Sequence, residues 1–295
     1  MCIRDSYGGM SAVEWGKLGQ IVMSWVVSPI AGGAIAFLVF TLIHKQIFTS
    51  DSPARRAGQL APLMIFPVVV ILALSIFYKG LKNLHLNLSF LEALEIAAGA
   101  GLLASLGFAL GLRNFWRKAC ELDPATQVQQ VERVFGYLQV CTACYVAFAH
   151  GANDVANAVG PVAGIYCAIK HHAVAGQVPV PLWILGVGAV GIVLGLATYG
   201  YRVISTIGEK ITEMTPTRGF SAEFACATTV LFCSRLGLPI STTHTLVGAV
   251  VGVGFARGIA SLDRRVIMNI VSSWLITIPA AAIITVLLYQ VISRV

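Results

Sequence analysis

Charged side chains are scarce in this sequence. They make up 11% of its 295 residues, whereas 57% are hydrophobic, and the mean hydropathy is +0.81. A soluble domain carries about 25% charged residues, so the composition excludes an ordinary soluble protein. The apolar runs approach the roughly 20 residues that a helix needs to cross a bilayer, and they lack the period-2 alternation of a transmembrane barrel. The sequence therefore predicts an all-α, polytopic membrane protein, with the lipid bilayer as its first partner.

Acidic residues are the rarer of the two charged kinds. There are 13 of them against 20 basic residues, for a formal net charge of +7. A basic balance is also typical of proteins that bind nucleic acid. Here, however, the basic residues lie in short loops between apolar runs, which is the positive-inside pattern. We therefore expect no nucleic-acid partner and predict a multi-pass protein of the bacterial inner (plasma) membrane.

Patterns that bind transition metals are also missing. Cys141 and Cys144 form a C-x-x-C within an apolar run, without a second cysteine pair or histidine partners. Such an isolated pair is typical of free thiols rather than of a zinc or redox site. We expect no cofactor, and no metal beyond a co-transported Na⁺.

The apolar runs and the basic loops together predict a topology. Arg55 and Arg56 lie in one loop, and the loop at 113–133, two crossings later, is also basic, so both belong on the cytoplasmic side. The run at 220–257 is interrupted, and each limb has only about 16 residues, which is short for a full crossing. A re-entrant or short hairpin fits it better. The predicted runs are 19–44, 61–79, 91–112, 134–170 (interrupted), 182–205, 220–257 (interrupted) and 267–293.

Two segments far apart in the chain are similar. Residues 21–29 (IVMSWVVSP) match residues 270–279 (IVSSWLITIP), and on the predicted topology they cross the membrane in opposite directions, as an inverted repeat requires. Chance similarity between two Ser-Trp helices is the alternative. The repeat would make the chain a fragment that lacks most of the first copy. It predicts a non-native or unstructured start at 1–13, the tail of a first inverted repeat at 14–60, connecting transmembrane helices and a cytoplasmic loop at 61–132, and a second inverted repeat at 133–295.

One carboxylate stands alone in an apolar stretch. Asp154 is the sole acid between Glu132 and Glu209, and no Lys or Arg lies between Arg133 and Lys170 to neutralise it. An ionisable group at membrane depth is costly, and by default it marks a substrate or ion pathway. The position of Asp154 therefore indicates transport.

The residues around this acid weaken a helix. The segment 151–161 reads GANDVANAVGP, and its Gly, Asn and Pro residues favour an unwound turn. Asn153, Asp154 and Asn157 can then converge, since residues three or four apart share a helix face. The freed N–H groups of the following half-helix would point at an anion. A polar kink that is satisfied by its neighbours is the alternative.

A second motif combines a helix break with hydroxyl groups. Gly237, Leu238 and Pro239 end one helix, and the Ser241-Thr242-Thr243 run can cap the next. A helix N-terminus with hydroxyl donors and no acid is a plausible cradle for an oxyanion. Ser and Thr also back-bond inside membrane helices, but paired discontinuous spans are the best sequence pointer to a transporter site.

The charge on Asp154 restricts the mechanism. A phosphate ion beside an ionised carboxylate is strongly repelled at low dielectric, so either Asp154 is protonated or a small cation lies between the two. Oxygen atoms of Asn153 and Asp154 suit such a cation. Glu223, near the start of the helix before the hydroxyl motif, is either an acid favoured by the helix dipole or a cation ligand that reaches inward.

Together, the GANDVANAVGP and GLPISTTH motifs resemble those of the inorganic phosphate transporter (PiT) family, the sodium- or proton-coupled phosphate permeases. The resemblance is nearly letter for letter at 150–161 and 237–254, and it extends over most of the chain. It implies a secondary active transporter that imports inorganic phosphate together with Na⁺ or H⁺. It also implies inverted repeats with broken helices, and a homodimer is common for such transporters.

The resemblance also implies roles for particular residues. The family carries both motifs in each of two repeats, and this sequence holds the second-repeat copies alone, so we expect the chain not to transport by itself. His150 and His244 are supporting residues. The coupling cation is assigned to Asp154, Asn153 and Glu223. The phosphate-binding residues are Asn153, Asp154, Asn157, Ser241, Thr242 and Thr243.

Two other functions remain as alternatives. A permease for another oxyanion, such as sulfate or arsenate, would use the same groups, because the shapes and hydrogen-bonding needs are shared. An intramembrane serine hydrolase would need Ser241 as nucleophile with His244 and Asp154, since a triad is recognised by geometry rather than chain order. The sequence contains no G-x-S-x-G-like elbow for that nucleophile.

Overall fold

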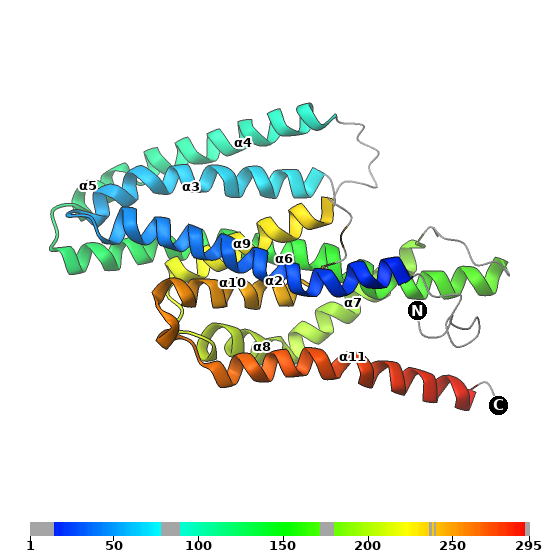
Figure 1. The fold of residues 1–295 in the computed structure, drawn as a ribbon. Coiled ribbons are helices and arrows are strands. Elements are labelled where there is room, and N and C mark those ends of the chain that lie inside the picture. The colour runs from blue at the N-terminus through cyan, green and yellow to red at the C-terminus, as the bar shows by residue number, and fades with distance from the viewer. Residues whose placement is uncertain (1–14, 78–88, 172–179, 236–237, 239, 293–295) are drawn as a thin grey trace.

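The computed structural model describes residues 15–77, 89–171, 180–235, 238 and 240–292, and in this part of the chain every regular element is a helix (Figure 1). The first half contains α2 (Trp15–Ile43), η2 (His44–Phe48), α3 (Pro53–Ser75), α4 (Phe90–Gly111), α5 (Arg113–Ala119) and α6 (Pro124–His171). The second half contains α7 (Leu182–Gly195), η5 (Leu196–Gly200), α8 (Tyr201–Ser205), η6 (Thr206–Lys210), α9 (Pro216–Arg235), α10 (Thr242–Arg257), η7 (Ile259–Ser261) and α11 (Arg264–Ile292). The predicted start at 1–13 lies outside the described residues.

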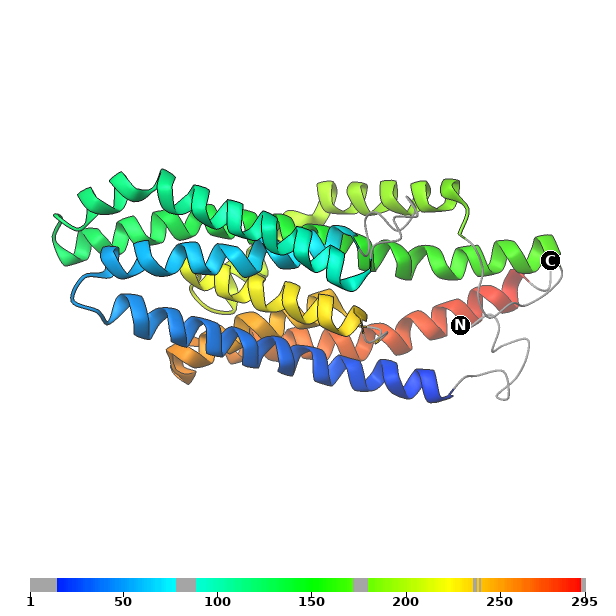
Figure 2. The same ribbon diagram turned by 90° about the horizontal axis from the view of Figure 1, so that it is seen from above.

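Six helical stretches of the described residues are long and apolar enough to cross a membrane. Seen from above, the long helices run roughly along one axis (Figure 2), as expected of a polytopic helical protein. The stretches are Leu18–Phe48, Pro53–Ser75, Phe90–Gly111, Pro124–Cys167, Leu182–Lys210 and Arg264–Ile292. The all-α, membrane-spanning fold class is confirmed.

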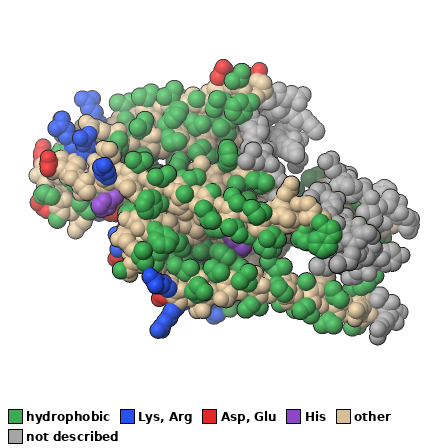
Figure 3. Space-filling model, in the orientation of Figure 1, with side chains coloured by type: hydrophobic (Ala, Val, Ile, Leu, Met, Phe, Trp, Pro, Cys, Tyr) green, Lys and Arg blue, Asp and Glu red, His purple; other side chains and the backbone are tan. Residues whose placement is uncertain are grey.

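Charge lies at the ends of the helices rather than along them. On the face shown in Figure 3, Lys and Arg gather at the end of the molecule where α2 finishes and where α3, α6 and α11 begin. The apolar middle carries large exposed side chains, such as Leu63 at 67% and Leu275 at 70%, because lipid rather than water covers them. The positive-inside rule predicts that the basic end is the cytoplasmic one.

Local capping decides where several of these helices begin. Ser89 and Glu92 form a capping box before α4: the Glu92 N–H donates to Ser89 Oγ at 3.3 Å, and the Ser89 N–H donates to Glu92 Oε2 at 2.7 Å. Asp263 caps α11 through the N–H groups of Arg265 and Val266. Such contacts satisfy donors that a helix start would leave without partners.

The expected break in the span at 134–170 is wrong. α6 runs through the whole GANDVANAVGP motif as one helix of 48 residues, with Pro161 inside it. In lipid an unpaired backbone group costs several kcal/mol, whereas an interior glycine costs about 1 kcal/mol. Keeping the backbone hydrogen bonds therefore outweighs the poor helix propensity of Gly and Asn. The interruption predicted within 220–257 is confirmed, because α9 ends at Arg235 and α10 begins at Thr242.

The hairpin of α9 and α10 is held against α2 by a glycine seam. Gly33 and Gly252 face each other so closely that a Cβ on Gly252 would lie 2.7 Å from the Gly33 carbonyl carbon. Gly248 crosses Pro29 in the same way, with its Cβ position 2.5 Å from the Pro29 Cα. Small residues let membrane helices approach backbone to backbone, so this seam positions the N-terminus of α10.

Candidate functional site

The two limbs of the hairpin begin and end on the same side. Arg257, the last residue of α10, donates to the carbonyl oxygen of Glu213 at 3.2 Å, and Glu213 lies in the loop before α9. The 16 residues of α10 rise about 24 Å at 1.5 Å per residue, less than the roughly 30 Å of a hydrocarbon core. The tip of the hairpin, where α9 breaks and α10 starts, is therefore buried at membrane depth.

Asp154 meets the tip of the hairpin through Thr242. The Thr242 hydroxyl lies 3.2 Å from Asp154 Oδ2 and 3.0 Å from His150 Nδ1. His150 Nε2 lies in turn 3.0 Å from Asp154 Oδ2, one helical turn earlier on α6. Thr242 is buried at 4% exposure, whereas the His150 and Asp154 side chains keep 34% and 31% exposed. The three side chains form one cluster with an open face.

Asn153 ties this cluster to the backbone of the hairpin. Its Nδ2 donates to Asp154 Oδ1 at 3.0 Å and to the Ile240 carbonyl oxygen at 3.2 Å. Both donors of the amide are thus used, and its Oδ1 stays available as an acceptor. Asn157 also lies in α6, but its side chain is outside what the structure describes.

The other hydroxyl residues of the second motif have different positions. Ser241 is the N-cap of α10, and its Oγ accepts the His244 N–H at 3.3 Å, as the sequence predicts. Thr243 is exposed, and no hydrogen bond joins it to the Asp154 cluster among the described residues. Of the three predicted hydroxyl ligands, the structure brings Thr242 to the carboxylate.

Glu223 belongs to a separate cluster. Thr142 donates to Glu223 Oε2 at 2.6 Å, and Gln139 Nε2 lies 3.5 Å from Oε1. Thr142 and Asp154 are twelve residues apart on α6, which separates the two clusters by about 18 Å along the helix axis. Sequence reasoning missed Gln139 and Thr142, although two polar side chains at i and i+3 in an apolar run were a visible signal.

His244 has a packing role in this structure. Its ring stacks on Trp274 of α11, with ring centroids 3.8 Å apart and planes inclined by 26°. Ser241 Oγ accepts the backbone N–H of His244, and among the described residues no hydrogen bond joins it to a histidine ring. A nucleophile and base in contact, which a serine hydrolase needs, are therefore not assembled by Ser241 and His244.

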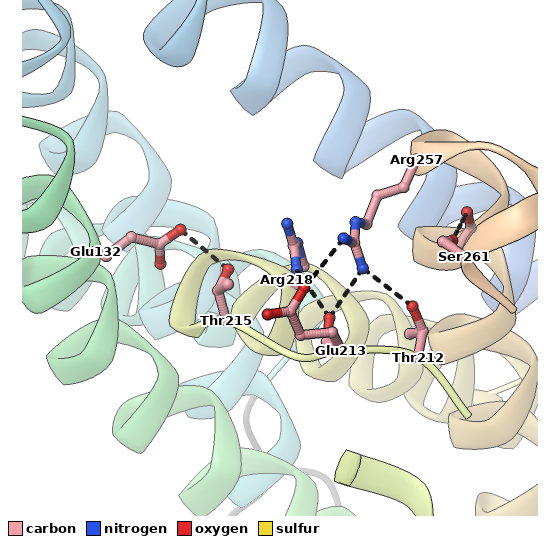
Figure 4. Close-up of polar contacts among 8 residues, drawn as sticks. Glu132, Thr212, Glu213, Thr215, Arg218, Arg257 and Ser261 are labelled. Atoms are coloured by element: carbon pink, nitrogen blue, oxygen red, sulfur yellow. Dashed lines mark hydrogen bonds and ion pairs between the residues drawn. The ribbon is translucent and has the colours of Figure 1, made fainter. Parts of the chain in front are cut away.

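A polar network closes the cytoplasmic end of the hairpin (Figure 4). Glu213 receives Arg257 Nη2 at 3.2 Å and Arg218 Nη1 at 3.4 Å, and Arg257 also donates to Thr212 Oγ1 at 3.2 Å. Burial lowers the pKa of the Arg218 guanidinium from its usual value, and the neighbouring Arg257 lowers it further. This network joins the start of α9 to the end of α10.

α6 is joined to the same region. Glu132 accepts the Thr215 hydroxyl at 3.0 Å and the Thr217 N–H at 2.9 Å. These bonds fix the loop before α9 to the first part of α6. The hairpin is therefore held to α6 at two places: at its base by Glu132, and at its tip by the contact between Thr242 and Asp154.

The chemistry of the Asp154 cluster is that of an ion-binding site. It offers a carboxylate, an imidazole, a hydroxyl and an amide oxygen, with no fixed positive charge among its described members. Oxygen-rich groups of this kind suit a hard cation such as Na⁺. Within the described part of the chain, no group of three or more His, Cys, Asp or Glu residues gathers as a metal centre would need.

Comparison with known proteins assigns the fold. Residues 5–285 match the model of the phosphate transporter family. This chain belongs to the phosphate transporter family. Its members are transporters and not enzymes, so the hydrolase alternative is wrong.

Three transporters that are similar to this chain extend that assignment. A relative from Pyrococcus furiosus, whose given name is that of a phosphate permease, is 46% identical over 96% of this chain and 67% of its own length. The inorganic phosphate transporter 2-1 of Arabidopsis thaliana, named as chloroplastic, is 41% identical over 98% of this chain and 52% of its own length. A solved structure titled the sodium-dependent phosphate transporter has a TM-score of 0.87 and 38% identity, and the match covers 100% of this chain and 71% of that one. The chain thus spans about two thirds of the archaeal relative and about half of the plant relative.

Proposed function

We propose that this protein takes part in secondary active import of inorganic phosphate, with Na⁺ as the coupling ion. The observation that carries the proposal is the contact between Asp154 of α6 and Thr242 at the tip of the hairpin, at 3.2 Å. It joins a membrane-embedded acid to a helix N-terminus, and such ends favour anions. The kinship with a transporter titled sodium-dependent favours Na⁺ over H⁺.

Electrostatics explains why a cation is needed. Two like unit charges 4 Å apart repel by about 4 kcal/mol at an effective dielectric constant of 20, and phosphate carries between one and two negative charges at neutral pH. A Na⁺ ion between Asp154 and the phosphate replaces this repulsion by two attractions. Bound Na⁺ would also draw the Thr242 oxygen toward itself and turn the hydroxyl hydrogen toward His150 Nδ1. Phosphate binding should therefore depend on Na⁺.

Glu223 is assigned to a second cation. Its carboxylate and the Thr142 hydroxyl offer oxygens to a cation about 18 Å along α6 from Asp154, and Gln139 Nε2 lies beside the carboxylate at 3.5 Å. At that separation the two sites hold different ions. We therefore assign Asp154 and Asn153 to the ion that accompanies phosphate, and Glu223 to an ion that stabilises the packing of α6 on α9.

The Asp154 carboxylate should also discriminate between phosphate and sulfate. Phosphate near neutral pH retains a P–OH group that can donate a hydrogen bond to a carboxylate, whereas sulfate carries no proton and can only accept. Arsenate resembles phosphate in this respect. Asp154 therefore favours phosphate or arsenate over sulfate.

The remaining parts of the proposal concern the whole transporter. About a third of each of the Asp154 and His150 side chains is exposed. Further groups must cover these side chains before an ion can pass without water, so we infer that this chain alone does not transport. The opposed directions of α2 and α11 (Figure 1) support the inverted-repeat organisation with boundaries at 60, 132 and 133. A homodimer and a location in the bacterial inner membrane complete the proposal.

Binding is tested by the thermal stability of the purified chain in detergent. A ligand that binds the folded state raises the free energy of unfolding, by about 2.7 kcal/mol at a hundredfold excess over its Kd. The melting temperature rises with it. Na⁺ in place of choline should raise the melting temperature, and phosphate should raise it further in the presence of Na⁺. Sulfate should add nothing.

Asp154→Asn keeps the shape of the side chain but removes its charge. We expect it to abolish the phosphate effect, while Glu121→Gln, at an exposed cytoplasmic position, leaves the effect intact. A phosphate effect that survives Asp154→Asn would contradict the assignment of the site. Robust uptake of labelled phosphate by liposomes that contain this chain alone would instead contradict the inference that it does not transport by itself.

A further inference from the structure

An apolar groove opens on the membrane surface between α2, α3 and α9. It has a volume of about 220 Å³, and all nine side chains that line it are hydrophobic. Val39 and Leu42 come from α2, Leu63 and Pro67 from α3, and Phe224 from α9. Leu42 and Leu63 are 58% and 67% exposed, so no described helix covers the groove.

The groove lies in the cytoplasmic half of the bilayer. α2 ends, and α3 and α9 begin, at the cytoplasmic end of the molecule. From Arg56, in the first turn of α3, to Pro67 is eleven residues, or about 16 Å at 1.5 Å per residue. Half of a hydrocarbon core is about 15 Å. Arg56 and the groove that begins at Leu60 therefore together span about one leaflet.

Arg56 stands at the mouth of this groove. On α3 it lies four residues before Leu60, and eight before Met64, both of which line the groove, so these residues share one helix face. Arg55, its neighbour, points about 100° away around the helix. Both guanidinium groups are exposed.

The mouth is also positively charged as a whole. The stretch from His44 to Arg56 contains three cations, Lys45, Arg55 and Arg56, and one acid, Asp51. Each of these four side chains is exposed. Near a membrane surface, each Lys or Arg contributes about 1 kcal/mol of attraction for anionic lipid.

We propose that this groove is a binding site for one anionic phospholipid of the cytoplasmic leaflet. An acyl chain fills the apolar groove, and the headgroup phosphate pairs with Arg56 at its mouth. The fit rests on three matching properties: an apolar lining, a length of about one leaflet from Arg56 to the inner end of the groove, and a cation at the height of the headgroups. Since Phe224 of α9 lines the groove, the lipid contacts the helix that carries Glu223 and steadies α9 against α3.

The test uses photoactivatable lipids. The full chain is reconstituted into vesicles of phosphatidylcholine that contain a trace of phosphatidylglycerol with a diazirine on its acyl chain, and in parallel a trace of phosphatidylcholine with the same diazirine chain. After irradiation, labelled residues are mapped by mass spectrometry. We expect phosphatidylglycerol to label the segments 60–67 and 220–224 several-fold more than phosphatidylcholine does.

Two variants decide the role of the charge. Arg56→Ala should reduce the preference for phosphatidylglycerol in the groove clearly more than Arg55→Ala, on the other face of the same turn, because Arg56 alone of the two shares the helix face of Leu60 and Met64. Melting temperatures of both variants show whether the fold is intact. Equal labelling by the two lipids in the parent chain, equal effects of the two variants, or labelling of the groove by neither lipid, as a second protein copy seated on it would cause, would overturn the proposal.

Discussion

Gly252→Ala tests the glycine seam that positions the functional site. The added Cβ would lie 2.7 Å from the carbonyl carbon and Cα of Gly33, and the nearest ordinary contact distance is 3.4 Å. The two helices must therefore separate by at least 3.4 − 2.7 = 0.7 Å. Neither backbone can rotate out of the way as a side chain could, so α10 must shift relative to α2.

The magnitude follows from a matched control. Gly191→Ala, on α7, places its Cβ where no atom lies within 4 Å, and both substitutions gain the same helix propensity of up to about 1 kcal/mol. The difference between the two variants is then the overpacking cost alone, about 1–3 kcal/mol. Gly33→Ala, whose Cβ would lie 2.9 Å from the Gly248 carbonyl oxygen, should fall between them.

The assay is thermal unfolding of the purified chain in one detergent. Gly252→Ala should melt several degrees below Gly191→Ala. It should also weaken the stabilisation by Na⁺ and phosphate, because Thr242 begins the same helix α10 and contacts Asp154 of α6 at 3.2 Å. Equal melting temperatures for the two variants would refute the close approach of α2 and α10. A lower melting temperature with ligand stabilisation intact would refute the claim that the seam sets the site.

Other substitutions test the contacts around the site. Thr142→Val removes the hydroxyl that donates to Glu223 at 2.6 Å and should weaken the stabilisation by Na⁺ measured without phosphate; an unchanged Na⁺ effect would argue against a cation there. Trp274→Ala removes the ring stacked on His244. Since an aromatic pair contributes about 0.5–1.5 kcal/mol beyond its buried area, the melting temperature should fall by a few degrees. No change would show that α11 is held by other contacts. Glu213→Gln removes the acid shared by two arginines, but its side chain is 76% exposed, so the loss should stay below about 1 kcal/mol and shrink as salt is added; a larger loss that is independent of salt would contradict a surface network.

The break between α9 and α10 could be predicted because its cause is local. The Gly-Leu-Pro sequence at 237–239 predicts the end of one helix, and α9 ends at Arg235; the Ser241 hydroxyl caps the next helix by accepting the His244 N–H. The positions of the basic loops, and hence the cytoplasmic end, also follow from the sequence, since positive-inside topology depends on where charges lie along the chain. The importance of Asp154 could be inferred from its isolation in an apolar run.

Tertiary structure decided what local residues could not. The GANDVANAVGP motif stays helical in α6, because in a bilayer the need to pair every backbone group outweighs the weak propensities of Gly and Asn. Gln139 and Thr142 became relevant when α9 brought Glu223 against α6. Likewise Thr242, rather than its two hydroxyl neighbours, meets Asp154. Which groups are costly to bury in lipid can be predicted from the sequence, since that cost belongs to each residue. Which of those groups share a site depends on the packing of α6, α9 and α10, since the contacts join residues more than eighty positions apart.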